Sequence, residues 1–148
     1  MKFEKFLKSV GTYGEVVTLN ESEEKWLVCG GVGMVIPRGV DNLLGKSTDN
    51  EYASIVHALT NAVYDDPVTL SKAVLLDPAG NAKAIYRVFE TALGDTVGII
   101  NADYGLLEKR DLLGYGEIET DDGTTIKYLL IFNHSGNVIG FITGTDKF

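Results

Sequence analysis

Strand-forming segments lie at both ends of the chain, and this placement limits the possible folds more than any other feature. Near the start, residues 15–19 and 25–29 are rich in apolar and β-branched side chains and flank a polar turn. Near the end, residues 117–120, 125–133 and 138–143 have the same character and are separated by short polar turns. Because such strands need partners, we expect an antiparallel sheet built from both chain ends.

The two ends also match each other residue by residue. Gly14-Glu15-Val16, Thr18 and Lys25-Trp26-Leu27-Val28 correspond to Gly116-Glu117-Ile118, Thr120 and Lys127-Tyr128-Leu129-Leu130, always 102 residues later. One explanation is convergence, because turns and strands use few residue types. The other is that residues 14–36 and 116–143 form similar hairpins in one sheet, with Trp26 and Tyr128 in equivalent places.

The middle of the chain has helical spacing. Thr48 and Glu51 match a capping box, which predicts a helix starting near Asp49. Further helices are predicted over residues 67–76, after Asp66-Pro67, and over residues 80–93, where the amphipathic stripe is clearest.

The remaining elements complete the expected fold. Residues 2–10 and 102–113 are predicted helices, and residues 96–101 a short buried strand. A length of 148 residues suits one domain. We therefore predict a single α+β domain over residues 1–148, with an antiparallel sheet from both chain ends and a central helical segment.

Charge and composition limit the classes of binding partner that we expect. The net charge of −8, from 13 basic and 21 acidic residues, opposes nucleic-acid binding, which needs clustered Lys and Arg. The N-terminus lacks a signal-peptide pattern, and no apolar run reaches 18 residues, so we expect no membrane partner. The chain has one cysteine, which forbids an intramolecular disulfide. These features predict a cytoplasmic location in the producing cell.

Two glycine-containing segments resemble nucleotide-binding motifs and differ from them in spacing. In Gly39–Ser47 five residues separate Gly39 from Gly45, where a phosphate-binding loop has four, so we interpret this segment as a surface loop. The run Gly30-Gly31-Val32-Gly33 does not fit the dinucleotide pattern. It predicts a bulge or a tight backbone contact in a sheet.

Catalytic and metal-binding patterns are missing from the sequence. Cys29 with His57 or His134 as a base has no supporting local signature, and Cys29 follows an apolar run typical of a buried thiol. The two histidines are 77 positions apart, and Cys29 has no companion thiol for a metal. We therefore assign no catalytic, cofactor or metal residue and expect a protein that is not an enzyme. An enzyme whose site is assembled across space stays an alternative.

The chain resembles small proteins encoded in the structural gene clusters of tailed phages and prophages. The resemblance lies in the opening residues Met1–Leu7, the glycine-rich strand Cys29–Ile36 and the closing hairpin Tyr128–Thr143. It implies a virion or assembly component, capsid- or tail-associated, and adds no functional residue.

The function expected is that of a non-enzymatic structural or adaptor protein of a multi-subunit assembly, with further copies of itself or virion proteins as partners. A small-ligand or regulatory module that uses the loop at 37–48 is an alternative. The closing strand Val138–Thr143 has no charge, so we predict it to be an exposed sheet edge. The candidate interface residues are Val138, Ile139, Phe141 and Ile142. The alternative is that this strand lies inside the sheet.

Overall fold

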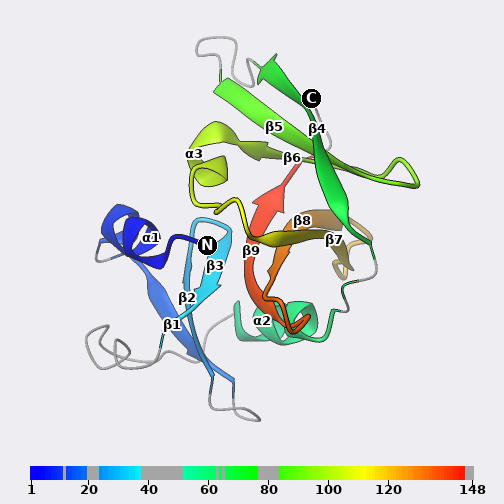
Figure 1. Cartoon of the computed structure of the whole chain (residues 1–148). Coiled ribbons are helices and arrows are strands. Elements are labelled where there is room, and N and C mark those ends of the chain that lie inside the picture. Colours follow the sequence, from blue (N-terminus) through cyan, green and yellow to red (C-terminus); the bar gives the residue numbers. More distant parts are fainter. Residues whose placement is uncertain are drawn as a thin grey trace.

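Antiparallel strands dominate the part of the chain that the computed structural model describes, which is residues 1–11, 13–19, 24–37, 52–62, 64, 66–76 and 84–145 (Figure 1). In chain order the elements are α1 (Phe3–Val10), β1 (Glu15–Thr18), β2 (Lys25–Cys29), β3 (Val32–Val35), α2 (Tyr52–Thr60), β4 (Val68–Leu76), β5 (Ala84–Thr91), β6 (Thr96–Ile100), α3 (Asn101–Tyr104), β7 (Leu112–Glu119), β8 (Thr125–Phe132) and β9 (Val138–Gly144). The predicted α+β class with antiparallel sheet is confirmed.

The larger of two sheets is built from the two ends of the chain, as predicted. Its strand order is β1-β2-β3-β9-β8-β7, and every neighbouring pair is antiparallel. Strands β1 to β3 form one meander and strands β7 to β9 form another. The pairing of β3 with β9, with Gly33 opposite Phe141, joins the two meanders into one sheet.

The two meanders agree in strand order but not in register. Trp26 lies opposite Val17 in the first meander. At an offset of 102 residues the partner of Tyr128 would be Glu119, but Gly116 lies there instead. The predicted likeness is therefore confirmed for strand order and wrong for register.

Trp26 and Tyr128 nevertheless occupy comparable places. Each lies on the middle strand of its meander, is buried, and contacts the ring of Phe141 at centroid distances of 6.0 and 5.8 Å. Gly33 makes room for that ring, because a Cβ atom at Gly33 would lie 2.3 Å from Phe141 Cε1. The tight backbone contact predicted for the glycine run is thus confirmed at Gly33.

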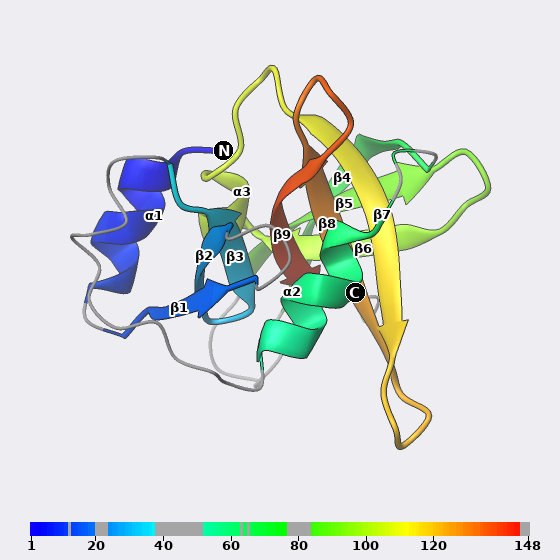
Figure 2. The same cartoon turned by 90° about the horizontal axis from the view of Figure 1, so that it is seen from below.

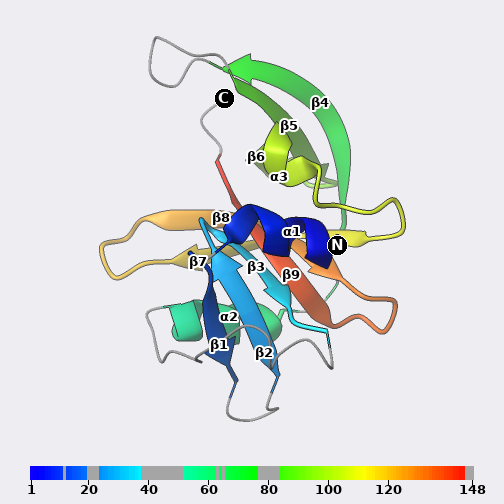
Figure 3. The same cartoon turned by 90° about the vertical axis from the view of Figure 1, so that its left-hand side faces the viewer.

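Both faces of the larger sheet are covered. Helix α2 packs on one face with Val56 and Leu59, and α1 packs on the opposite face with Phe6 and Val10. Figure 3 shows α1 in front of the strands and α2 behind them. The smaller sheet, β4-β5-β6, shares the face of α1 and contributes Phe89 to its hydrophobic cluster. The larger sheet is therefore the central layer.

The middle of the chain contradicts the predicted central helical segment. The segments expected as helices over 67–76 and 80–93 contain β4 and β5, which pair antiparallel, and residues 80–83 lie outside the described residues. The strand predicted over 96–101 is confirmed as β6, and the helix predicted over 2–10 is confirmed as α1. The helix predicted from Asp49 is confirmed over Tyr52–Thr60 as α2, and residues 49–51 lie outside the described residues.

The helical spacing of residues 84–91 was ambiguous for a physical reason. Two side chains four residues apart, such as Ile85 and Phe89, share one face of a helix and also one face of a strand. The β-branched and aromatic residues of this segment favour a strand. The segment pairs with β4 on one side and with β6 on the other, which makes it a strand.

The helix predicted over 102–113 is wrong for most of its length, because α3 ends at Tyr104 and β7 begins at Leu112. Between them the carboxylate of Asp111 accepts the backbone N–H of Glu108 at 2.8 Å and binds the ammonium group of Met1 at 2.9 Å. Both partners of the ion pair are nearly inaccessible to solvent. These contacts hold the connection against the start of the chain.

The closing strand is not a free edge, so that prediction is wrong. β9 lies between β3 and β8, where Val138, Phe141 and Ile142 are buried and Ile139 is half-buried. These candidate interface residues belong to the interior. They carry no charge because the strand has apolar neighbours on both faces. A short apolar run in a sequence is consistent with such a buried strand.

Candidate functional site

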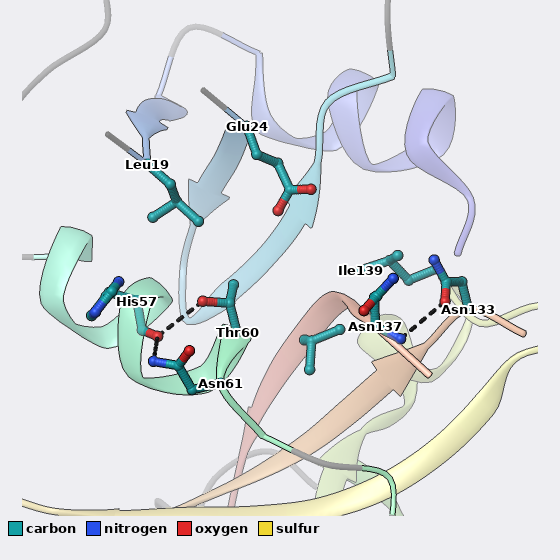
Figure 4. Close-up of a pocket in the computed structure, with 9 residues that line it drawn as sticks. Leu19, Glu24, His57, Thr60, Asn61, Asn133, Asn137 and Ile139 are labelled. Carbon is teal, nitrogen blue, oxygen red and sulfur yellow. Dashed lines mark hydrogen bonds between the residues drawn. The ribbon is translucent and has the colours of Figure 1, made fainter. Parts of the chain in front are cut away.

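A hollow of about 310 Å³ lies where polar residues from three parts of the chain meet (Figure 4). Its polar lining comes from the end of α2 and the residue after it (His57, Thr60, Asn61), from the residue before β2 (Glu24) and from the β8–β9 turn (Asn133, Asn137). Both hairpin connections lie at the same end of the larger sheet, because antiparallel neighbours bring alternate turns to one end. The hollow is therefore a product of the sheet topology.

Glu24 is held in the hollow by the core. The indole N–H of Trp26, whose side chain is fully buried, donates to Glu24 Oε1 at 2.9 Å. A buried indole N–H needs an acceptor, and this carboxylate supplies one. The backbone N–H of Leu19 also donates to the Glu24 carbonyl oxygen at 2.8 Å. The carboxylate is thus tied to the core cluster around Phe141.

The opposite wall is a turn closed by its own amide side chain. Asn133 Oδ1 accepts the backbone N–H groups of Ser135 and Asn137, both at 3.0 Å. Gly136 has a φ of 83°, which favours glycine, and it completes the turn. The amide nitrogen of Asn133 is the end of that side chain left to face other groups.

The third wall is the end of α2. The Thr60 hydroxyl and the Asn61 amide nitrogen both donate to the His57 carbonyl oxygen, at 2.9 and 3.1 Å. These bonds give a carbonyl in the last turn of α2 two side-chain partners. The Thr60 hydroxyl is bonded to the backbone of His57 and not to its imidazole, so no nucleophile–base pair is formed at this wall.

The groups that line the hollow can bind a polar molecule. The hollow offers a carboxylate, an imidazole and several amide ends, with Leu19, Val138 and Ile139 as apolar lining. Such groups suit a small polar molecule with hydroxyl or amide groups.

The thiol and the two histidines considered from the sequence are separated. Cys29 is the last residue of β2, whereas His57 lies beside the hollow near the first residue of that strand. His134 belongs to the β8–β9 turn, also at the hollow's end of the sheet. The structure therefore does not bring Cys29 together with either histidine.

The glycine and aspartate motifs have structural explanations where they are described. Gly30 and Gly31, with φ of 59° and 79°, form the turn between β2 and β3. Asp66 does not cap a helix, because β4 follows it, and its carbonyl oxygen accepts the backbone N–H of Tyr115 at 3.1 Å. The segment Gly39–Ser47 and the loop from residue 38 onward lie outside the described residues.

The predicted turn at 121–123 is confirmed, and Asp122 organises it. Its carboxylate accepts the Thr120 hydroxyl and the backbone N–H of Thr124, the latter at 2.9 Å. These bonds, that from the Thr120 hydroxyl first, lower the pKa of Asp122 to about 2.

The polar residues of the hollow were not predicted as a group. Glu24, Asn133 and Asn137 fall in or beside segments that the sequence marks as turns, but only the strand order reveals that those turns meet. The polarity of the turns was the available signal.

No three His, Cys, Asp or Glu side chains converge as a metal site within the described ranges. None of the helices there is long and apolar enough to cross a membrane. Comparisons with protein-family models, with curated proteins and with solved structures returned no match.

Proposed function

We propose that the protein is a non-enzymatic structural or adaptor component of a multi-subunit assembly, acting by contact with other protein chains. One observation supports the proposal above others, the edge strand β4. It is the outer strand of the smaller sheet, and no strand among the described residues pairs with its far side beyond the bridge from Pro67 to Gly114. An edge of this kind presents unpaired N–H and C=O groups to an added strand.

The edge is exposed over several consecutive residues. Thr69 to Ala73 are all exposed, and Leu70 exposes 44% of its surface. A register shift at Ser71 and the charge of Lys72 interrupt the strand. Such features limit indiscriminate pairing, so a partner has to match this particular strand.

The partner class follows from the resemblance noted in the sequence. A second copy of this chain or a virion protein would supply the added strand. The proposal thus keeps the assembly function expected from the sequence and moves its contact from β9 to β4.

Light scattering tests this function. Mass is measured against concentration, alone and with candidate virion proteins, for the wild type and for Ala73→Lys. The matched control is Ala58→Lys, which places the same side chain on an exposed residue of α2. We expect Ala73→Lys to weaken association at least about tenfold and Ala58→Lys to leave it unchanged. Equal masses for all three proteins under every condition would reject β4 as the contact.

A second candidate function is the binding of a small polar ligand in the hollow, which the polar residues in Figure 4 favour. A thermal-shift screen of sugars, amino acids and nucleosides tests it, because a ligand at 100 times its dissociation constant stabilises by about 2.7 kcal/mol. Binding in the hollow requires that Asn137→Ala and Glu24→Gln weaken the shift. A shift that both variants retain would place the ligand elsewhere.

A further inference from the structure

The outward side of α1 combines apolar and basic side chains. Phe3 and Leu7, half-buried and one helical turn apart, line a groove of about 760 Å³, the α1 groove. Lys2, Lys5 and Lys8, all exposed, border the α1 groove at intervals of three residues. A chain with a net charge of −8 thus concentrates three of its 13 basic residues at one apolar groove.

The acidic residues near this groove do not cancel its charge. Glu108 forms an ion pair with Arg110, with Nε and Oε2 3.0 Å apart. Glu4 is exposed on α1, and the exposed Lys109 lies in the adjoining connection. The groove therefore keeps a local excess of positive charge.

The tip of the β7–β8 hairpin has the opposite character. Glu117, Glu119, Asp121 and Asp122 are all exposed, and residues 117–125 contain no Lys or Arg. The bonds within the turn, made by Asp122, fix its shape. Figure 2 shows this hairpin projecting from the body of the molecule.

The groove and the hairpin tip lie at opposite ends of the molecule. Figures 1 and 2 both place α1 on one side and the β7–β8 hairpin on the other. One copy therefore cannot close the contact on itself in this conformation. A contact between two different patches repeats head to tail, which gives a ring or a filament.

We infer that the α1 groove of one copy receives the acidic β7–β8 hairpin tip of a second copy. This contact rests on the proposed assembly function and identifies one of its partners as the chain itself. Charge complementarity selects the occupant, because the lysines that border the groove meet the carboxylates of the tip. The apolar floor of Phe3 and Leu7 adds burial that an open surface pair would lack.

The contact is tested by reversing charge on each side. The helix variant is Lys5→Glu with Lys8→Glu, and the hairpin variant is Glu119→Lys with Asp121→Lys, all at exposed positions. Association is measured by light scattering at about 0.01 M and about 1 M salt, where the screening length falls from about 30 to about 3 Å. A cooperative thermal unfolding transition checks that each variant is folded. If the helix variant does not fold, Lys5→Gln with Lys8→Gln is used in its place.

The mixture of the two variants gives the decisive result. We expect the wild type to associate at low salt and dissociate at high salt, and each variant alone to associate at least about tenfold more weakly, because its two patches then carry like charges. Mixed in equal amounts, the variants should recover association, since the tip of each one then meets an oppositely charged groove.

Three outcomes would overturn the inference. They are a wild type that stays monomeric at low salt, a hairpin variant that associates as the wild type does, and a mixture that does not recover. Sedimentation with phosphatidylserine vesicles covers the other occupant of a basic apolar helix. Vesicle binding lost only in the helix variant, without recovery on mixing, would assign the groove to a membrane surface. If Ala73→Lys lowers the mass and the charge reversals do not, the assembly function stands and this contact is rejected.

Discussion

The two sheets of this protein are made of similar strands but are used differently. The larger sheet has an apolar layer on each face, and most residues of its inner strands β8 and β9 are buried. The smaller sheet contributes Phe89, Val97 and Ile99 to the cluster on the side of α1, and its strand β4 is exposed from Thr69 to Ala73. The difference separates a buried layer that stabilises the fold from an exposed strand that contributes less to it.

Amide hydrogen exchange should show the largest contrast between the sheets. Breaking the bonds of β8 and β9 requires near-global unfolding, whereas the β4 amides that point away from β5 face no neighbouring strand among the described residues. We expect at least about 10³-fold slower exchange in β8 and β9 than at these β4 amides. Comparable protection of β4 in the isolated protein at low concentration would show that its edge is covered.

Removing the ring at the centre of the larger sheet should have the largest effect of the substitutions. Phe141→Ala deletes the contacts with Trp26 and Tyr128 and should cost about 3–5 kcal/mol in the free energy of unfolding. Ile85→Ala in the smaller sheet, where the side chain is 43% exposed, should cost about 1 kcal/mol or less. Urea titration of both variants measures the two values, and equal losses would contradict the contrast.

Adding a methyl group at the junction of the two meanders should have an intermediate effect. Gly33→Ala places its Cβ 2.3 Å from the Phe141 ring, so overpacking should cost about 1–3 kcal/mol. If the ring is the cause, Gly33→Ala combined with Phe141→Leu should cost less than the two changes added together. Additive losses in this double-mutant cycle would show that the strain lies elsewhere.

The smallest effect concerns the exposed β7–β8 turn, which polar bonds and not burial hold in place. Because the pKa of Asp122 is lowered from 3.8 to about 2, its ionised form stabilises the turn above about pH 4, and this contribution disappears as the pH falls toward 2. An NMR titration of the carboxyl group should have its midpoint near 2. Thr120→Val should raise that midpoint, and an unchanged midpoint would exclude the Thr120 hydroxyl as its main cause.

The ends of the chain could be predicted because strand signals and turn signals agreed there. The sequence between Asp121 and Gly123 predicted a turn, and the strands on either side pair across it. In the middle the signals conflicted, since the spacing of Ile85 and Phe89 suits both a helix and a strand. The pairing of this segment with β4 on one side and β6 on the other, which depends on tertiary structure, identifies it as a strand.

The order of strands was the missing information for the sites. Val138–Thr143 has the composition of an unprotected edge and also that of a central strand, and only the pairing with β3 decides between them. The polar hollow likewise depends on which turns lie at the same end of the sheet, because those turns bring Glu24 and Asn137 together. Local sequence patterns do not indicate which strands or turns become neighbours in the folded sheet.

The pairing of Gly33 with Phe141 also means that the larger sheet cannot be completed until almost the whole chain has been synthesised. The ribosome makes about 5–20 residues per second, so β3 waits roughly 5 to 20 s before its partner strand is synthesised. Closing a loop of that length costs about 4 kcal/mol of chain entropy, which the β3–β9 contact has to offset at once. Until β9 is made, the edge of β3 that later pairs with it faces no partner strand, which leaves it open to other chains.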